Sequence, residues 1–236
     1  MDTHPALRVL GRLLFWLLVF VGGLALGLAA FTVAQAFSNT AIPGLLNWLF
    51  AASSVQVMWY VTRAAGIMAY LLLWLSTAWG LAVSSKILDH LLHRAFTYDF
   101  HQFISLLAIG FLALHMVVLL ADAYLPFSIA QILVPFISPY RPLWVGIGVF
   151  GFYLTVLVTV TFYLRGRIGM KTFRTIHALS LVAYLGATLH GFFAGTDSAL
   201  PATQIMYAGT FLVVVFLISY WLIDLALRKS RQAVRA

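Results

Sequence analysis

Four histidines lie in long stretches of the chain that contain no Asp, Glu, Lys or Arg: His101, His115, His177 and His190. Imidazole is a common metal ligand, and it also binds and releases protons near neutral pH. The chain has no cysteine, which excludes thiolate zinc sites, iron–sulfur clusters, disulfides and covalent c-type haem attachment. Any metal centre must therefore use His, Asp, Met or carbonyl ligands.

The elements that must position these histidines are membrane-spanning helices. Of the 236 residues, 63% are hydrophobic and 8% are charged, whereas a soluble domain carries about 25% charged residues. Six uncharged stretches are each long enough to cross the hydrocarbon core, which takes about 20 residues. They are residues 13–37, 64–85, 100–121, 143–164, 175–195 and 204–223. The sequence thus predicts an all-α integral membrane protein, with one six-helix transmembrane domain over residues 1–236 and no soluble domain.

Two further apolar runs are too short or too broken to span. Residues 45–57 contain Asn47 and Gln56, and residues 126–139 contain three prolines. We expect both at the membrane surface or dipping partway into it. The apolar run of residues 13–37 exceeds the 7–15 residues of a signal-peptide core, so we expect it to be a retained helix.

The basic residues predict the orientation. Twelve of the fourteen Lys and Arg fall on one side of the predicted spans, and Arg63 and Arg141 fall on the other. The positive-inside rule then places both termini on the cytoplasmic side of the cell's inner or plasma membrane. The net charge of +8 is explained by topology and by contact with anionic lipid, so it does not indicate nucleic-acid binding.

The spacing of the histidines brings them to two levels. Fourteen residues separate His101 from His115, and thirteen separate His177 from His190, which is about 20 Å along a helix in both cases. Both helices follow a cytoplasmic loop and run in the same direction. We expect an inner pair, His101 and His177, and an outer pair, His115 and His190. Two facing imidazole pairs are the arrangement that ligates two stacked b-type haems through the iron.

The thirteen-residue spacing is less regular, because it leaves His177 and His190 about 140° apart around an ideal helix. Either this span contains a π-bulge or another local distortion, or the two haems approach it from different sides. Interhelical hydrogen bonding or a proton relay are the other interpretations of intramembrane histidines. Relays usually include carboxylates, which the six predicted spans lack.

Several local sequences accompany this pattern: Thr62-Arg63-Ala64, Tyr98-Asp99-Phe100-His101, Arg174-Thr175-Ile176-His177, and His190-Gly191 before residues 195–198. With the histidine spacing, residues 60–223 resemble the ferric-reductase-like transmembrane domain. Ferric reductases and NADPH oxidases share this domain, and the membrane haem subunit of periplasmic methionine sulfoxide reductase is related. The resemblance implies transmembrane electron transfer, and it matches Arg63 to the family's arginine in the second span.

The chain departs from that family in two ways. Ferric reductases and NADPH oxidases usually carry flavin- and NADPH-binding domains after the last span, whereas this chain stops at Ala236. We therefore expect no FAD or NAD(P) on this chain. NADPH oxidases also have a second histidine one turn after the outer ligand of span three, where this chain has Leu119.

Other residues have weaker signals. Arg63 and Arg141 are candidates to pair with the propionates of an outer haem, and an interfacial anchor is the other interpretation of both. Arg174 is a candidate on the inner side, where the topology signal is the other explanation. Gly146-x-Gly148-x-x-Gly151 matches a dinucleotide-binding pattern. Because it lies in a predicted span, close helix packing or space beside a macrocycle explains it better.

The expected function is electron transfer through two bis-histidine b haems, from a cytoplasmic flavoprotein reductase or a quinol to an outer acceptor. Ferric iron, oxygen or a periplasmic redox enzyme are the candidate acceptors. Two alternatives remain open: a structural or assembly haem subunit of a larger membrane complex, and a haem-free transporter.

Overall fold

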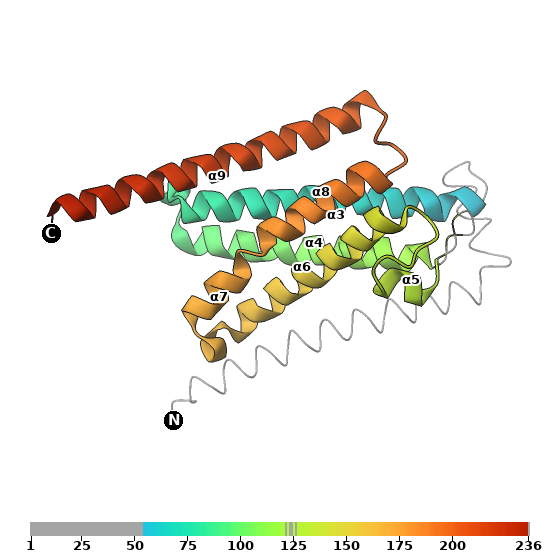
Figure 1. The fold of residues 1–236 in the computed structure, drawn as a ribbon, viewed down its shortest axis with the longest axis horizontal. Helices are drawn as coiled ribbons and strands as arrows, with labels where there is room; N and C mark the ends of the chain where they lie inside the picture. The colour runs from blue at the N-terminus through green and yellow to red at the C-terminus, as the bar shows by residue number, and fades with distance from the viewer. Residues whose placement is uncertain (1–53, 121, 123–124, 126, 236) are drawn as a thin grey trace. The chain divides into compact units, whose positions relative to one another are not determined.

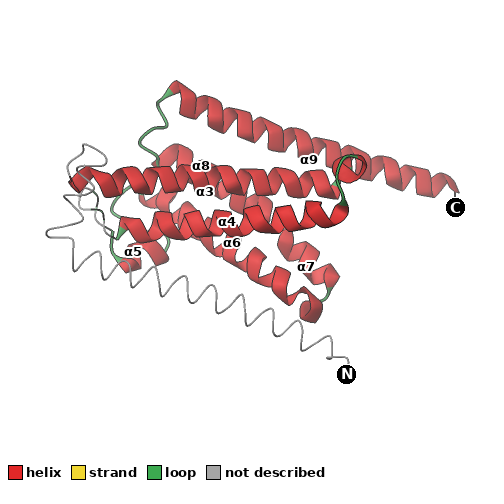
Figure 2. Cartoon of the chain, turned by 180° about the vertical axis from the view of Figure 1, so that it is seen from behind, coloured by secondary structure: helices red, strands yellow, loops and turns green. Residues whose placement is uncertain are grey.

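The computed structural model describes residues 54–235, apart from residues 121, 123–124 and 126 (Figure 1). By its internal contacts the chain divides into two units, Met1–Val57 and Met58–Ala236, and the second unit holds the four histidines of the predicted spans. All regular secondary structure in the described residues is helical (Figure 2). The predicted first span, residues 13–37, lies outside the described residues.

Five helical segments are long and apolar enough to cross a membrane. The helical architecture is confirmed in the described residues, and these segments are those expected of an integral membrane protein. They are α3 (Ser54–Ser84), α4 (Arg94–Leu119), α6 (Pro142–Ile168), α7 (Met170–His177) together with α8 (Ser180–Ala194), and α9 (Pro201–Arg235). Successive segments run in opposite directions (Figure 1). The short helices η1 (Ile87–His90) and α5 (Ile129–Leu133) lie in the connections on either side of α4.

The start of α3 differs from the prediction. The helix begins at Ser54 rather than near residue 64, so residues 54–57 belong to it and not to a surface segment. Arg63 therefore lies inside the helix. Its guanidinium forms an ion pair with Asp197 and lies 4.1 Å from the centre of the Trp59 ring. Because the charge is paired and covered, the cation does not end the helix.

The remaining boundaries follow local chemistry. Pro142 occupies the first turn of α6, where its fixed φ suits the helix and its missing N–H costs nothing. Gly169, with φ of 81°, ends α6 in a conformation that side chains disfavour. The helix α9 continues beyond residue 223, the predicted end of span six, into a basic stretch that ends at Arg235.

The predicted fifth span is interrupted directly after His177. The N–H of Leu179 bonds the Ile176 carbonyl at 3.0 Å, and the N–H of Leu181 bonds the Ala178 carbonyl at 3.2 Å. These bonds close over three residues rather than four, as in a 3₁₀ turn, and they change the rotation between α7 and α8. A local distortion was one of the expectations from the thirteen-residue histidine spacing, and the structure contains one.

Among the described helices, α6 and α8 pack on each other most extensively. A methyl group on Gly151 would lie 3.6 Å from the Ala183 carbonyl, and one on Gly186 would lie 3.6 Å from Ile147. Small residues thus let the two backbones approach each other, as is common between membrane helices. Of the three glycines in the dinucleotide-like pattern of α6, Gly151 thus serves helix packing.

Candidate functional site: two facing histidine pairs

The four predicted histidines meet as two pairs across the bundle. The rings of His101 and His177 have their centroids 6.1 Å apart, and their planes are inclined at 77°. The rings of His115 and His190 are 6.4 Å apart and inclined at 74°. The predicted partners on each level are therefore adjacent in the structure, with one ring of each pair on α4 and the other on the α7–α8 segment.

The outer pair is held by two backbone carbonyls. Nδ1 of His115 lies 2.8 Å from the carbonyl oxygen of Thr62, and Nδ1 of His190 lies 2.9 Å from that of Trp144. A carbonyl oxygen only accepts hydrogen bonds, so Nδ1 carries the proton in both neutral rings. The lone pair is then on Nε2, which is the arrangement of a histidine ready to bind a metal.

The inner pair is held less firmly. Nδ1 of His101 lies 3.5 Å from the Ser76 hydroxyl, which is itself 2.6 Å from the Ser105 hydroxyl. Nδ1 of His177 is buried and has no hydrogen-bond partner among the described residues. The His177 ring instead packs against Phe173, with the centroids 5.1 Å apart. The two levels thus differ in how strongly the imidazole orientation is fixed.

Three of the four rings pack against a glycine of a neighbouring helix. A methyl group on Gly66 would lie 2.9 Å from Nδ1 of His115, and one on Gly148 would lie 2.5 Å from Nδ1 of His190. A methyl group on Gly80 would lie 3.2 Å from Cε1 of His101. A larger residue at Gly66 or Gly148 would displace the outer rings, whereas one at Gly80 would require a smaller shift of the His101 ring.

The outer pair lines an apolar cavity that runs from the middle of the bundle to the end that holds Trp59 and Asp197. Tyr70, Leu73 and Ala108 line its deep part, and His115 and His190 face into it. The inner histidines are not among its lining residues. An apolar cavity with two imidazoles on opposite walls is suited to a flat, largely apolar ligand.

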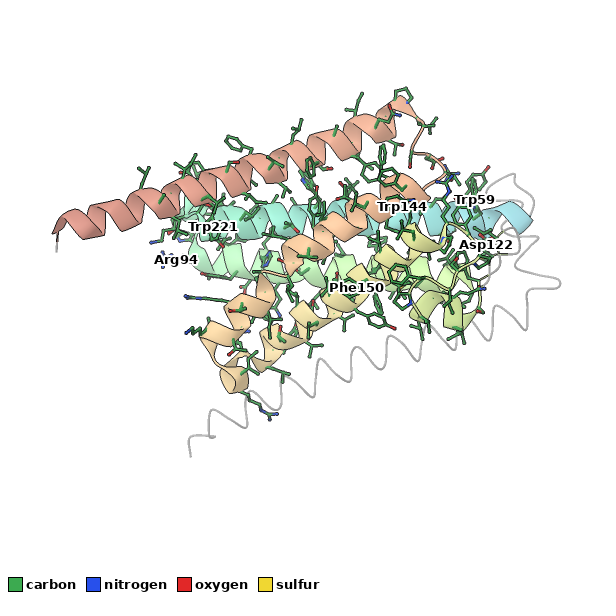
Figure 3. The ribbon with its side chains drawn as sticks, in the orientation of Figure 1. Trp59, Arg94, Asp122, Trp144, Phe150 and Trp221 are labelled. Atoms are coloured by element: carbon green, nitrogen blue, oxygen red, sulfur yellow. The ribbon has the colours of Figure 1, made fainter. Side chains whose placement is uncertain are left out.

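Polar groups gather at the open end of this cavity. Arg63, Asp122 and Asp197 line it, and Figure 3 shows Trp59 and Asp122 together at this end, away from Arg94 and Trp221. The Arg63 guanidinium pairs with Asp197, but its Nε is buried without a hydrogen-bond partner among the described residues, and so is the Thr62 hydroxyl. The cavity therefore has unsatisfied hydrogen-bonding groups beside the outer pair.

The other two arginines proposed from the sequence lie elsewhere. Arg141 caps the start of α6, and its guanidinium donates to the Phe193 carbonyl. Arg141 does not line the cavity of the outer pair. Arg174 is exposed on α7, three residues before His177. The structure thus brings Arg63 to the outer cavity and leaves Arg141 and Arg174 on the surface.

A buried tyrosine cluster lies between the two levels. The Tyr70 hydroxyl is 2.5 Å from the Thr210 hydroxyl and 3.4 Å from that of Tyr184, while the Tyr207 ring packs on Tyr70 with the centroids 4.8 Å apart. Trp74 also donates to the Thr210 carbonyl at 3.1 Å. This cluster attaches α9 to the rest of the bundle.

The sequence analysis missed these supporting residues, although one signal was present. Gly66 and Gly80 are fourteen residues apart, the same separation as His101 and His115. In antiparallel helices, matched spacings place matched positions opposite each other, as Gly66 on His115 and Gly80 on His101. The backbone carbonyls of Thr62 and Trp144 have no sequence signal, because every residue has a carbonyl.

No protein-family model, curated protein or solved structure matches the chain significantly.

Proposed function

We propose that this protein is a di-haem b-type cytochrome that transfers electrons across a membrane, from a cytoplasmic flavoprotein or quinol to an acceptor on the outer side. The main support for the proposal is the presence of two facing imidazole pairs, His101 with His177 and His115 with His190. When bound, the haems would supply the one-electron chemistry, and two histidine ligands per iron favour outer-sphere transfer over oxygen binding at the metal.

The separation of the rings supports ligation of one metal by each pair. Two imidazoles that bind a metal through Nε2 from opposite sides have centroids roughly 6 Å apart, since each metal–nitrogen bond is about 2 Å long and the centroid lies about 1 Å behind the nitrogen. The observed separations are 6.1 and 6.4 Å. Histidines that bond each other directly would have their rings closer, with one nitrogen about 3 Å from the other.

The set of donor atoms favours haem over a bare metal ion. Among the described residues, no group of three or more His, Asp or Glu side chains converges on one point. Each level thus offers two protein ligands, whereas a bare zinc ion is usually held by three or four. A porphyrin provides the other donors to its iron, so a haem is complete with two axial histidines.

The chain's own residues would orient and shield the ligand. The carbonyls of Thr62 and Trp144 hold the outer imidazoles with Nε2 free, and the apolar lining of the cavity excludes water. At the open end, the buried Nε of Arg63 and the Thr62 hydroxyl are suited to a carboxylate such as a haem propionate. The propionate roles of Arg141 and Arg174 stay predictions.

A reduced-minus-oxidised spectrum with a pyridine haemochrome count per chain tests this function. We expect two b haems per chain, falling to about one in His115→Ala and in His101→Ala. His93→Ala is the matched control, because His93 is exposed at the start of α4 and should leave the count unchanged. If protein made with ample haem contains none, the cytochrome proposal fails and a haem-free transporter becomes the better explanation.

The ferric-reductase-like resemblance fits this proposal and names the candidate acceptors, which are ferric iron, oxygen or a periplasmic redox enzyme. Transmembrane transfer would be established if a donor added on one side of a vesicle reduces the outer haem and an acceptor on the other side oxidises it again. Two haems that are reduced without any such transfer would favour the structural-subunit alternative.

A further inference from the structure

At the end of the bundle that holds the inner pair, two corners of the described part differ in charge. We call residues Arg165, Arg167, Lys171 and Arg174 the α6–α7 corner; all four are exposed. Residues 142–196 contain no acidic residue, so nothing within this segment offsets these charges. This corner is a cluster of four cations.

The α3–α4 corner is neutral by comparison. We define it by Lys86, Asp89, Arg94 and Asp99, which are also exposed. Arg94 and Asp89 form an ion pair at 2.8 Å. Its two cations are therefore balanced by two anions, although this corner belongs to the same predicted cytoplasmic side.

The cationic corner is also connected to the inner pair by aromatic contacts. The Arg165 guanidinium lies 4.0 Å from the centre of the Phe162 ring. Phe162 contacts Phe173 at 6.1 Å between centroids, and Phe173 contacts His177 at 5.1 Å. One cation–ring contact and two ring–ring contacts thus lead from an exposed arginine to an inner histidine.

Helix α7 presents this corner outward. Phe173 is buried against the bundle, whereas its neighbours Lys171, Thr172, Arg174 and Thr175 are exposed. These α7 cations are therefore exposed on the helix that carries His177.

We propose that the α6–α7 corner is the docking surface for a soluble, acidic flavoprotein that donates electrons to the inner site. The proposal rests on the proposed function and selects one of its two donors. A reduced flavin that gives up two electrons also releases two protons. The electrons enter the inner site in two single transfers, the flavin is left oxidised, and the protons go to the solvent on the donor's side.

The asymmetry between the corners favours a protein over anionic lipid. Lipid headgroups surround a membrane bundle on all sides, so they would attract cations at both corners equally. A docking protein meets one patch, and complementary charge there steers its approach and fixes its orientation. The positive-inside rule predicts an excess of cations in every cytoplasmic loop. It therefore does not explain why one corner is cationic and the other is neutral.

The test measures binding of reduced flavodoxin, a soluble acidic flavoprotein, to the full-length protein in phosphatidylcholine nanodiscs at low ionic strength. The double variant Arg167→Glu/Lys171→Glu changes the cationic corner without touching Arg174. The double variant Lys86→Glu/Arg94→Glu makes the same change of charge at the other corner and serves as the control. Both variants are checked for monodispersity and haem content.

We expect binding to weaken about tenfold or more in the first variant and less than about twofold in the second, with a smaller salt dependence in the first. Equal weakening in both variants, or no measurable binding by the unmodified protein, would overturn the proposal. If the protein contains two haems but binding is not weakened preferentially in the first variant, the docking site alone is refuted. If the protein contains no haem, the proposed function is refuted.

Discussion

At the scale of single residues, the two histidine pairs differ in what holds them. The outer imidazoles donate to the carbonyls of Thr62 and Trp144, whereas His177 has a buried Nδ1 with no partner among the described residues. Hydrogen bonds from a metal-bound histidine to a carbonyl fix the ring and increase its basicity. The outer site is therefore more strongly preorganised than the inner site.

This difference predicts unequal affinities for haem. We expect the outer site to bind haem about tenfold or more tightly than the inner site, since loss of such supporting bonds typically costs 10–100-fold in metal affinity. Haemin titration into the haem-free forms of His101→Ala, which keeps the outer pair, and His115→Ala, which keeps the inner pair, measures both. Equal affinities would show that the carbonyls contribute no preorganisation.

The glycines beside the rings give a second residue-scale prediction. In Gly148→Ala the added methyl would lie 2.5 Å from Nδ1 of His190, so the ring must move and the bond to the Trp144 carbonyl must lengthen. We expect loss of the outer haem and about half of the haemochrome signal. Gly166→Ala is the control on the same helix, because a methyl there meets no atom within 4 Å. A full complement in Gly148→Ala would contradict the assignment.

At the scale of elements, the turn between α7 and α8 decides the direction of His177. A straight helix would leave His177 and His190 on different faces, yet both rings face partners on α4. The three-residue hydrogen bonds at residues 176–181 supply the missing rotation. The sequence spacing indicated that a distortion was needed, but not its type or place.

An alanine inserted after Leu179 should therefore separate the two levels. It would rotate α7 by about 100° relative to α8 and turn His177 away from His101, while His190 and its contacts stay in place. We expect one haem per chain, with the spectrum of the His101→Ala variant. The same insertion after Gly166, outside the span between the histidines, should preserve more of the inner haem. Retention of both haems after the first insertion would show that the turn can absorb a residue.

The contact between α9 and the rest of the bundle gives a second prediction for single elements. Tyr70 bonds Thr210 at 2.5 Å, and these groups are buried among aromatic rings. In Tyr70→Phe the hydroxyl is lost while the ring remains, and Thr210 keeps its bond to the Met206 carbonyl at 2.7 Å. We expect a loss of about 1 kcal/mol in the free energy of unfolding, measured by denaturant unfolding in detergent. Tyr220→Phe, at an exposed residue of the same bundle, should change it little.

At the scale of the whole molecule, the orientation in the membrane is the property to test, and the chain is well suited because it has no cysteine. Single cysteines at Gly166, beside the basic corner, and at Ala199, in the exposed connection before α9, report on opposite ends. With the termini in the cytoplasm, a membrane-impermeant maleimide should label Ala199→Cys in intact spheroplasts and Gly166→Cys after lysis. The reverse pattern would invert the proposed direction of electron flow.

The sequence by itself determined the features that depend on composition and spacing along one helix. Helical membrane segments follow from uncharged stretches of about 20 residues, and five of them are confirmed; the segment 13–37 stays a prediction. The matching of His101 with His177 and of His115 with His190 followed from helix direction and rise per residue. These are one-dimensional properties, so no knowledge of neighbouring helices was needed.

Tertiary structure decided which faces of the helices oppose each other, because helix rotation depends on the packing of all neighbours at once. It placed the carbonyls of Thr62 and Trp144 on the outer imidazoles and Gly148 beside His190. It also paired Arg63 with Asp197, although 134 positions separate them in the sequence. Backbone carbonyls and missing side chains have no distinctive sequence signal, and their roles appear when the neighbouring helix is in place.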